Sequence, residues 1–146
     1  MRRPGTPDTL LKKLCVGSCT ATRSHTNSDP TKVENASILF MSFVYADVSV
    51  ANLGQQQEVD SAKLSGPQVS IPGLGESAIV YETVDPKKSQ TRFTAAIQDS
   101  NFRMVIYLSA FTNNGDLSDA KRTDLRNSLT ATAKASYPKF TAGLKK

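Results

Sequence analysis

The chain has 146 residues, a length that suits one domain with its own core, without disulfides or metals to support it. Its hydrophobic fraction is 38%, it has no tryptophan, and no apolar run is long enough to span a bilayer. The formal charge of +5 comes from scattered basic residues, without any nucleic-acid recognition motif. These features argue against a membrane-spanning protein and against a dedicated nucleic-acid surface. We expect one domain over residues 1–146, with frayed ends at 1–5 and 141–146.

The N-terminal segment predicts a short helix rather than an export signal. Thr6 is suited to cap this helix, Pro7 suits its first position, and the helix should run to about Leu14. A signal peptide needs an apolar stretch of about 7–15 residues, and the only candidate is interrupted by Lys12 and Lys13. We therefore expect no intact signal peptide in this sequence, and a lipid anchor only on a longer precursor.

The next segments predict two strands and a helix. Cys19–Ser24 reads as a short strand, and residues 25–36 form a polar loop by composition. Ile38–Tyr45 is the most apolar run, so we expect it to be a central strand covered on both faces. The following helix is predicted over Ser49–Ala62, with Ser49 as its N-cap and with Val50, Leu53 and Val59 facing inward.

A three-stranded meander is the strongest pattern in the chain. Gly73-Leu74-Gly75 marks a turn before it, because glycine accepts a positive φ at little cost. Strand-forming residues then predict strands over Ala78–Val84, Arg92–Gln98 and Phe102–Ala110.

The last two of these strands predict their own register. If Asp99 faces Phe102, one face of the pair is wholly apolar, with Ile97 opposite Met104, Ala95 opposite Ile106 and Phe93 opposite Leu108. The other face then pairs Gln98 with Arg103 and Thr94 with Tyr107. A slip of one residue would mix the two faces, so burial should select this register.

The C-terminal segment predicts a helix capped by Asp116 or Ser118 and stopped by Pro138. Its inward positions follow i, i+4 spacing at Leu125, Leu129, Ala133 and Tyr137, and its solvent face carries Lys121, Arg122 and Arg126. The predicted fold is therefore α+β, an antiparallel sheet of about five strands with the helices packed on one face, in the order α-β-β-α-β-β-β-α.

The sequence offers little for catalysis. His25 is the only histidine and lies in a predicted polar loop, and no nucleophile-elbow motif surrounds any serine. One histidine and two cysteines are too few ligands for a metal centre, and no cofactor motif is present. We therefore predict no enzymatic activity, no metal and no cofactor. Arg103 and Tyr107, on the face opposite the apolar ladder, are the only side chains that we assign to a ligand surface.

Cys15 and Cys19 are the only cysteines, and their spacing is not the C-x-x-C of thiol oxidoreductases. Two interpretations stay open. In an exported protein they would form a small disulfide loop, with Gly17 allowing the bend, and otherwise they are two small buried residues.

Three features together resemble a family of uncharacterised actinobacterial secreted lipoproteins. They are the Cys19-Thr20 start of a strand, the Gly-Leu-Gly-Glu-Ser-Ala turn that ends at Ala78, and the hairpin and helix that follow. Ala21 stands where that family usually has an aromatic residue. The resemblance implies export and anchoring at the cell surface, and it implies no known activity and no catalytic residues.

The sequence thus predicts an exported, envelope-associated, non-enzymatic domain that binds an unknown partner or ligand. The alternative is a cationic adaptor for an anionic polymer, either nucleic acid or a wall polymer, because of the +5 charge. The lack of a recognition motif argues against nucleic acid within that alternative.

Overall fold

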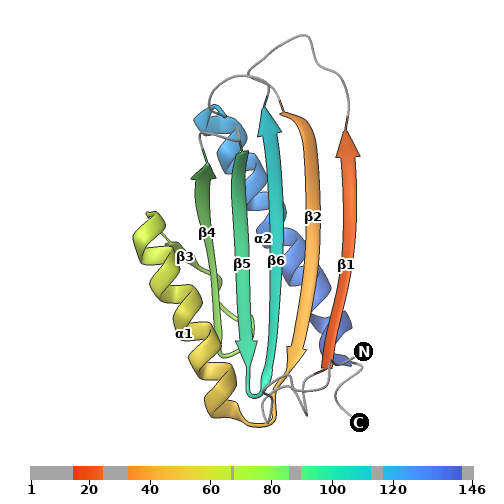
Figure 1. Ribbon diagram of the computed structural model, residues 1–146, viewed down its shortest axis with the longest axis vertical. Coiled ribbons are helices and arrows are strands. Elements are labelled where there is room, and N and C mark those ends of the chain that lie inside the picture. Colours follow the sequence, from red (N-terminus) through yellow and green to blue (C-terminus); the bar gives the residue numbers. More distant parts are fainter. Residues whose placement is uncertain (1–14, 25–32, 67, 86–89, 113–116, 143–146) are drawn as a thin grey trace, which may run out of the picture.

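The computed structural model describes residues 15–24, 33–66, 68–85, 90–112 and 117–142. Its strands form one antiparallel sheet in the order β1-β2-β6-β5-β4-β3 (Figure 1). The strands are β1 (Cys15–Ser24), β2 (Val33–Val44), β3 (Gln68–Ser70), β4 (Ser77–Asp85), β5 (Gln90–Asp99) and β6 (Phe102–Thr112). Helix α1 (Val48–Ser65) follows β2, and helix α2 (Asp119–Ala142) follows β6. The predicted α+β class with an antiparallel sheet is confirmed.

Two features of the predicted strands differ from the structure, namely their number and the length of the first one. The described part of the sheet has six strands rather than about five, because the short β3 precedes the meander and pairs with β4. The predicted helix over residues 6–14 lies outside the described residues. The first predicted strand is longer than expected, since β1 begins at Cys15 and continues to Ser24.

The predicted register of β5 and β6 is confirmed at every pair. The apolar face matches Ile97 with Met104, Ala95 with Ile106 and Phe93 with Leu108. The opposite face matches Gln98 with Arg103 and Thr94 with Tyr107, as the alternating pattern requires. The turn between β5 and β6 contains no glycine that would fix the register by itself. Burial of the apolar face therefore selects this pairing of the two strands.

The main core lies between this apolar face and α2. Phe93, Ile97, Met104 and Ile106 are fully buried there, and Leu129 of α2 packs among them. The four inward positions predicted for α2 are confirmed, because Ala133 is also buried and Leu125 and Tyr137 are partly buried against the same core.

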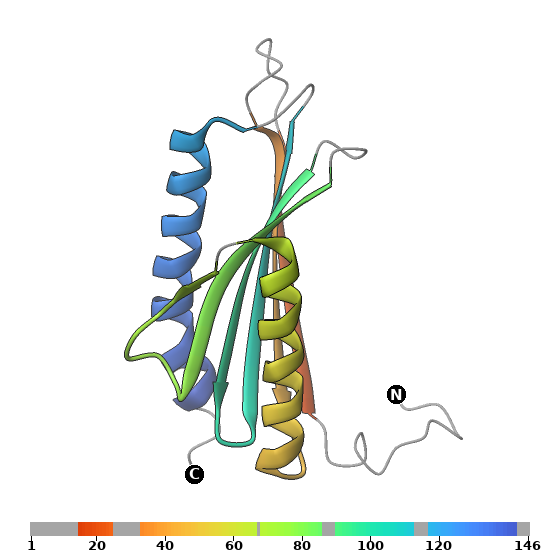
Figure 2. The ribbon, with the colours of Figure 1, turned by 90° about the vertical axis from the view of Figure 1, so that its left-hand side faces the viewer.

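Helix α1 covers the face of the sheet opposite to α2, so the prediction that both helices pack on one face is wrong. Figure 2 shows α1 and α2 on opposite sides of the sheet. The physical reason lies in β4 and β5, which carry apolar residues on both faces. Ile79, Tyr81 and Ala96 form a second buried cluster, which Ala62 of α1 covers.

α1 lies over β4, β5 and β6, so among the described elements β2 is covered by a helix on one face only. Ile38, Phe40 and Val44 of β2 are half-buried against the α2 core, and the residues that alternate with them are half-buried on the opposite face. The prediction that this strand is covered on both faces is therefore wrong.

The predicted cap of α1 is wrong, and its predicted phase is confirmed only in part, because Val59 packs against the second cluster whereas Leu53 does not. Asp47, not Ser49, is the N-cap, and its carboxylate accepts a hydrogen bond from the Val50 amide at 3.1 Å. Leu53, predicted to face inward, is 60% exposed. The buried positions are instead Ala51, Gln55 and Ala62, a small and polar set that hydrophobic periodicity does not detect.

α2 does not stop at Pro138, as its sequence predicts, but continues to Ala142. Proline lacks the amide that would bond to the carbonyl four residues earlier, and here that carbonyl belongs to the exposed Lys134. Contacts beyond the proline hold the last turn, since the Phe140 ring stacks on Phe40 with 6.2 Å between centroids. Tertiary packing therefore overrides the local preference for a stop.

The N-terminal cap of α2 follows one of the two alternatives. The Lys121 amide donates to the Ser118 hydroxyl at 3.2 Å, whereas Asp116 lies outside the described residues. Two residues predicted to face solvent instead bind the sheet, because Arg122 and Arg126 pair with Glu82 of β4 at 2.9 and 3.2 Å.

The predicted glycine turn is confirmed. Gly73 and Gly75 have φ values of 76° and 63°, in the left-handed region that favours glycine. A Cβ atom on Gly75 would lie 2.7 Å from the Gln98 carbonyl oxygen, so this position requires glycine for space as well. The close approach lets the Glu76 amide donate to that carbonyl at 2.9 Å, which joins the turn to β5.

Candidate ligand-binding groove

A polar groove lies on the α1 face of the sheet, between the second half of α1 and the upper parts of β4, β5 and β6. Its volume is about 440 Å³, within the range of about 300–1,000 Å³ typical of small-molecule sites. Hydroxyl, amide and charged groups line it together with two aromatic rings: Glu58, Ser61, Tyr81, Thr83, Asp85, Gln90, Arg92, Thr94 and Tyr107.

Arg92 and Tyr107 form one wall of the groove. The Arg92 guanidinium carbon lies 5.3 Å from the centroid of the Tyr107 ring, within the range of a cation–π contact. The pair is diagonal across β5 and β6, because Tyr107 stands opposite Thr94 and Arg92 stands two residues away. Stacking on the ring restricts the otherwise exposed Arg92 side chain, so its N–H donors are held at the groove.

Tyr81 and Glu58 form the opposite wall. The Tyr81 hydroxyl donates to Glu58 Oε2 at 2.6 Å, which ties α1 to β4. Burial and this hydrogen bond raise the pKa of Tyr81 above its ordinary value of 10.0. Burial and the Glu58 charge also raise the pKa of Tyr107. Both hydroxyls are therefore neutral at physiological pH and act as hydrogen-bonding groups rather than as bases.

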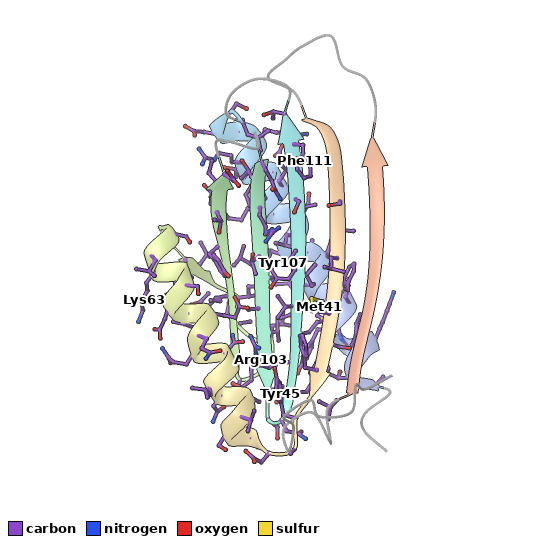
Figure 3. All side chains as sticks on the ribbon, viewed as in Figure 1. Met41, Tyr45, Lys63, Arg103, Tyr107 and Phe111 are labelled. Atoms are coloured by element: carbon purple, nitrogen blue, oxygen red, sulfur yellow. The ribbon has the colours of Figure 1, made fainter. Side chains whose placement is uncertain are left out.

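The structure separates the two residues that the sequence assigns to a ligand surface. Both lie on the face opposite the apolar ladder, as predicted, and Figure 3 shows Tyr107 further along β6 from Arg103, which lies beside α1. Tyr107 lines the groove. Arg103 is only 6% exposed, so its assignment to an accessible ligand surface is wrong.

Arg103 instead anchors α1 to the sheet. Its Nε donates to Gln55 Oε1 at 3.4 Å, its Nη1 donates to the Tyr45 hydroxyl at 3.3 Å, and its Nη2 lies 3.8 Å from Glu58 Oε1. Gly54 makes room for it, since a Cβ atom there would lie 2.7 Å from Nη1. Gly54, which has a low helix propensity, is thus the position where α1 passes over the guanidinium.

Glu58 links this anchor to the groove. One carboxylate oxygen faces Arg103 and the other accepts the Tyr81 hydroxyl, so the side chain is held by α1, β4 and β6 together. Glu58, Tyr81 and Arg92 were missed by the sequence analysis as site residues. The available signal was the polar alternation of Arg92 and Thr94 on the β5 face opposite the apolar ladder.

The charges that line the groove are mixed. Glu58 and Asp85 are the acidic residues in the lining and Arg92 is the basic residue. The remaining lining groups are hydroxyls, an amide and aromatic rings. An anionic ligand would meet two carboxylates, and a cationic ligand would meet the guanidinium. Neutral ligands with several hydroxyl groups match this arrangement best, because they both donate and accept hydrogen bonds.

Of the two interpretations of Cys15 and Cys19, the disulfide is incompatible with the structure. Both residues lie in the single strand β1, paired with Val44 and Phe40 of β2. A strand rises about 3.3 Å per residue, so their Cα atoms lie about 13 Å apart, well beyond the roughly 7 Å limit for a disulfide. The alternative that both cysteines are buried stays a prediction.

The described residues contain no group of three or more His, Cys, Asp or Glu side chains that converge on a metal position. His25, the only histidine of the sequence, lies outside the described part of the chain. Neither α1 nor α2 combines the length and the apolar composition needed to cross a bilayer.

Comparison of the chain with protein-family models, with curated proteins and with solved structures finds no match. The case for a function therefore depends on the geometry of the groove.

Proposed function

We propose that this protein is an exported, cell-envelope-associated, non-enzymatic domain that binds a small, neutral, polyhydroxylated ligand in the groove beside α1. The observation that carries the proposal is the groove itself, in which Arg92 stacked on Tyr107 faces Glu58 and Tyr81 across the sheet. Sites of this kind use a few fixed polar groups to orient a ligand and aromatic rings to bury its apolar faces.

The arrangement of these polar groups supports ligand binding rather than a role in packing alone. Glu58 is fixed by Tyr81 and Arg103, and Arg92 is fixed by Tyr107, so groups on both walls are ordered before a ligand arrives. Pre-ordered groups lose little conformational entropy on binding. Export and envelope association are supported by the resemblance of the Cys-Thr strand and the glycine turn to secreted lipoproteins.

Ligand binding is tested by titrating soluble, uncharged mono- and oligosaccharides into ¹⁵N-labelled protein and following amide shifts. We expect shifts concentrated on the residues that line the groove. Inorganic phosphate and spermidine serve as anionic and cationic probes, and we expect both to bind more weakly. Preferential binding of phosphate would instead favour the cationic adaptor, whose affinity would fall steeply with salt.

Arg92→Ala should weaken saccharide binding at least tenfold, because it removes the donor group over Tyr107. Lys63→Ala is the matched control, since Lys63 is an exposed cation on α1 outside the groove. Saccharide shifts that are absent, or that persist unchanged in Arg92→Ala, contradict the proposed ligand class.

The compartment needs a separate experiment. Fractionation of the source cells shows where the full-length gene product is located. We expect to find it in the envelope fraction or the secreted fraction. A purely cytosolic product would remove the envelope part of the proposal and leave the groove unaffected.

A further inference from the structure

The two edges of the sheet differ in length and protection. β1 forms one edge with ten residues, and among the described strands it has β2 as its only neighbour (Figure 1). β3 forms the other edge with three residues, and Pro72 follows soon after it. A long edge strand presents a row of unpaired backbone N–H and C=O groups, which is a template for another strand.

Within its own described residues, β1 lacks the sequence and backbone devices that usually block such pairing. Its sequence, CVGSCTATRS, contains no proline and no lysine, and its one charged residue, Arg23, is the second residue from its end. Natural edge strands are protected by charges, prolines, bulges or short length. β1 pairs with β2 over all ten positions without a register shift, so it has no bulge.

The sheet face beside this edge is apolar and only partly covered. Leu39, Met41 and Phe43 of β2 are half-buried on the face that carries α1, but α1 lies over β4, β5 and β6. Figure 3 shows Met41 on this face, away from α1. A second sheet joined at β1 would place two such strips on the same face, separated by the two β1 strands.

We propose that β1 pairs antiparallel with β1 of a second copy of this chain, joining the two sheets into one continuous sheet. A two-fold axis perpendicular to the sheet pairs the same edge of both copies, so the contact is self-complementary. Opposed residues must share a face, which leaves two registers of greatest overlap. They pair residues 15–23 with Cys19 on the axis, or residues 16–24 with Thr20 on the axis.

The β1 sequence is compatible with a second copy as the occupant, because neither register places like charges opposite each other. In both registers Arg23 stands opposite an uncharged residue, Cys15 or Gly17, and the two arginines lie toward opposite ends of the paired region. Near the two-fold axis the paired residues are small or carry hydroxyl groups, so no charged side chains repel each other there. The contact also closes, because each copy uses its long edge and keeps only the short β3 edge free.

Charge-swap variants test this pairing. Ser18 and Thr20 pair with Met41 and Leu39 in the β1–β2 register. In either register, positions 18 and 20 of one copy stand opposite or diagonal to the same positions of the other. Sedimentation should give a dimer for the wild-type chain and monomers for Ser18→Lys/Thr20→Lys and for Ser18→Glu/Thr20→Glu, since like charges oppose each other.

Mixing the two variants should restore a dimer, because lysine then faces glutamate. This rescue separates loss of pairing from loss of folding. The control is Leu53→Lys/Leu64→Lys, which adds two lysines at α1 positions that are 60% and 92% exposed, and it should leave the dimer intact.

A wild-type chain that stays monomeric at its highest soluble concentration overturns the proposal. So does a dimer that survives both charge variants, or the absence of a mixed dimer from variants with native circular dichroism. The groove is lined by residues of α1, β4, β5 and β6 and not by residues of β1. Saccharide affinity should therefore be equal in the monomer and the dimer. Failure of the edge pairing is therefore distinguishable from failure of the proposed ligand site.

Discussion

α2 packs on its face of the sheet through large apolar side chains, whereas α1 packs on the opposite face through small and polar ones. Leu129 of α2 lies in a core that includes Phe93, Ile97 and Met104. α1 buries alanines and makes hydrogen bonds instead. Its Gln55 donates to the Ala96 carbonyl at 3.0 Å, and its Asn52 accepts from Gln98 at 2.7 Å.

The difference shows how one sheet supports both stability and a site. The α2 face excludes water over most of its area, which is the dominant favourable term in folding. The α1 face keeps polar groups in fixed positions, and beside the second half of α1 these groups line the groove. Each face also has one tyrosine–carboxylate hydrogen bond, Tyr81 with Glu58 and Tyr137 with Asp99.

The largest expected effect is on the α2 face. Phe93→Ala removes a fully buried ring from the main core and should lower the free energy of unfolding by about 3–5 kcal/mol. Urea denaturation followed by circular dichroism measures it. Leu53→Ala on α1 is the control and should change stability by less than about 0.5 kcal/mol, because Leu53 is 60% exposed. Equal losses from both would mean that α1 packs in the phase its sequence predicts.

The second prediction breaks the polar anchor of α1. Glu58→Gln leaves the buried Arg103 without its carboxylate and should cost about 2 kcal/mol, less than a fully buried pair because the Glu58 side chain is 19% exposed. The matched control is Asp60→Asn on the same helix. Asp60 and its partner Lys63 are 61% and 62% exposed, so this change should cost less than about 0.5 kcal/mol.

The third prediction compares the two tyrosines and concerns pH. Burial and a neighbouring carboxylate raise the pKa of both Tyr81 and Tyr137 in the folded state. Their contribution to stability is therefore present below the ordinary pKa of 10.0 and is lost as the pH rises above it. Urea midpoints measured on both sides of pH 10.0 should show this alkaline loss.

Tyr81→Phe and Tyr137→Phe should each cost about 1.5 kcal/mol at neutral pH, because each removes a hydrogen bond to a carboxylate. Each should also reduce the alkaline loss. An alkaline loss as large in the double variant as in the wild-type chain would assign it to other groups.

The smallest expected effect is at the point where α1 passes over Arg103. Gly54→Ala gains about 1 kcal/mol of helix propensity but places a Cβ atom 2.7 Å from Arg103 Nη1. We expect the two terms to offset, leaving stability within about 0.5 kcal/mol of wild type. In an Arg103→Met background the clash is absent, so the same substitution should stabilise by about 1 kcal/mol. Identical effects in both backgrounds would show that Gly54 does not respond to the guanidinium.

The sequence by itself determined the parts of the fold that depend on local alternation. The β5–β6 register, the Gly73-Leu74-Gly75 turn and the inward positions of α2 were all predictable, because apolar period and glycine chemistry are properties of neighbouring residues. Of the site, the sequence identified Tyr107 and its face of the sheet.

Only the tertiary structure decided which face α1 covers, and with it the site. The buried residues of α1 are Ala51, Gln55 and Ala62, so no apolar stripe marks its inner face. The burial of Arg103, the pairing of Glu58 with Tyr81 and the groove across three strands all follow from where that helix lies. These contacts join residues far apart in the chain, and no local pattern records them.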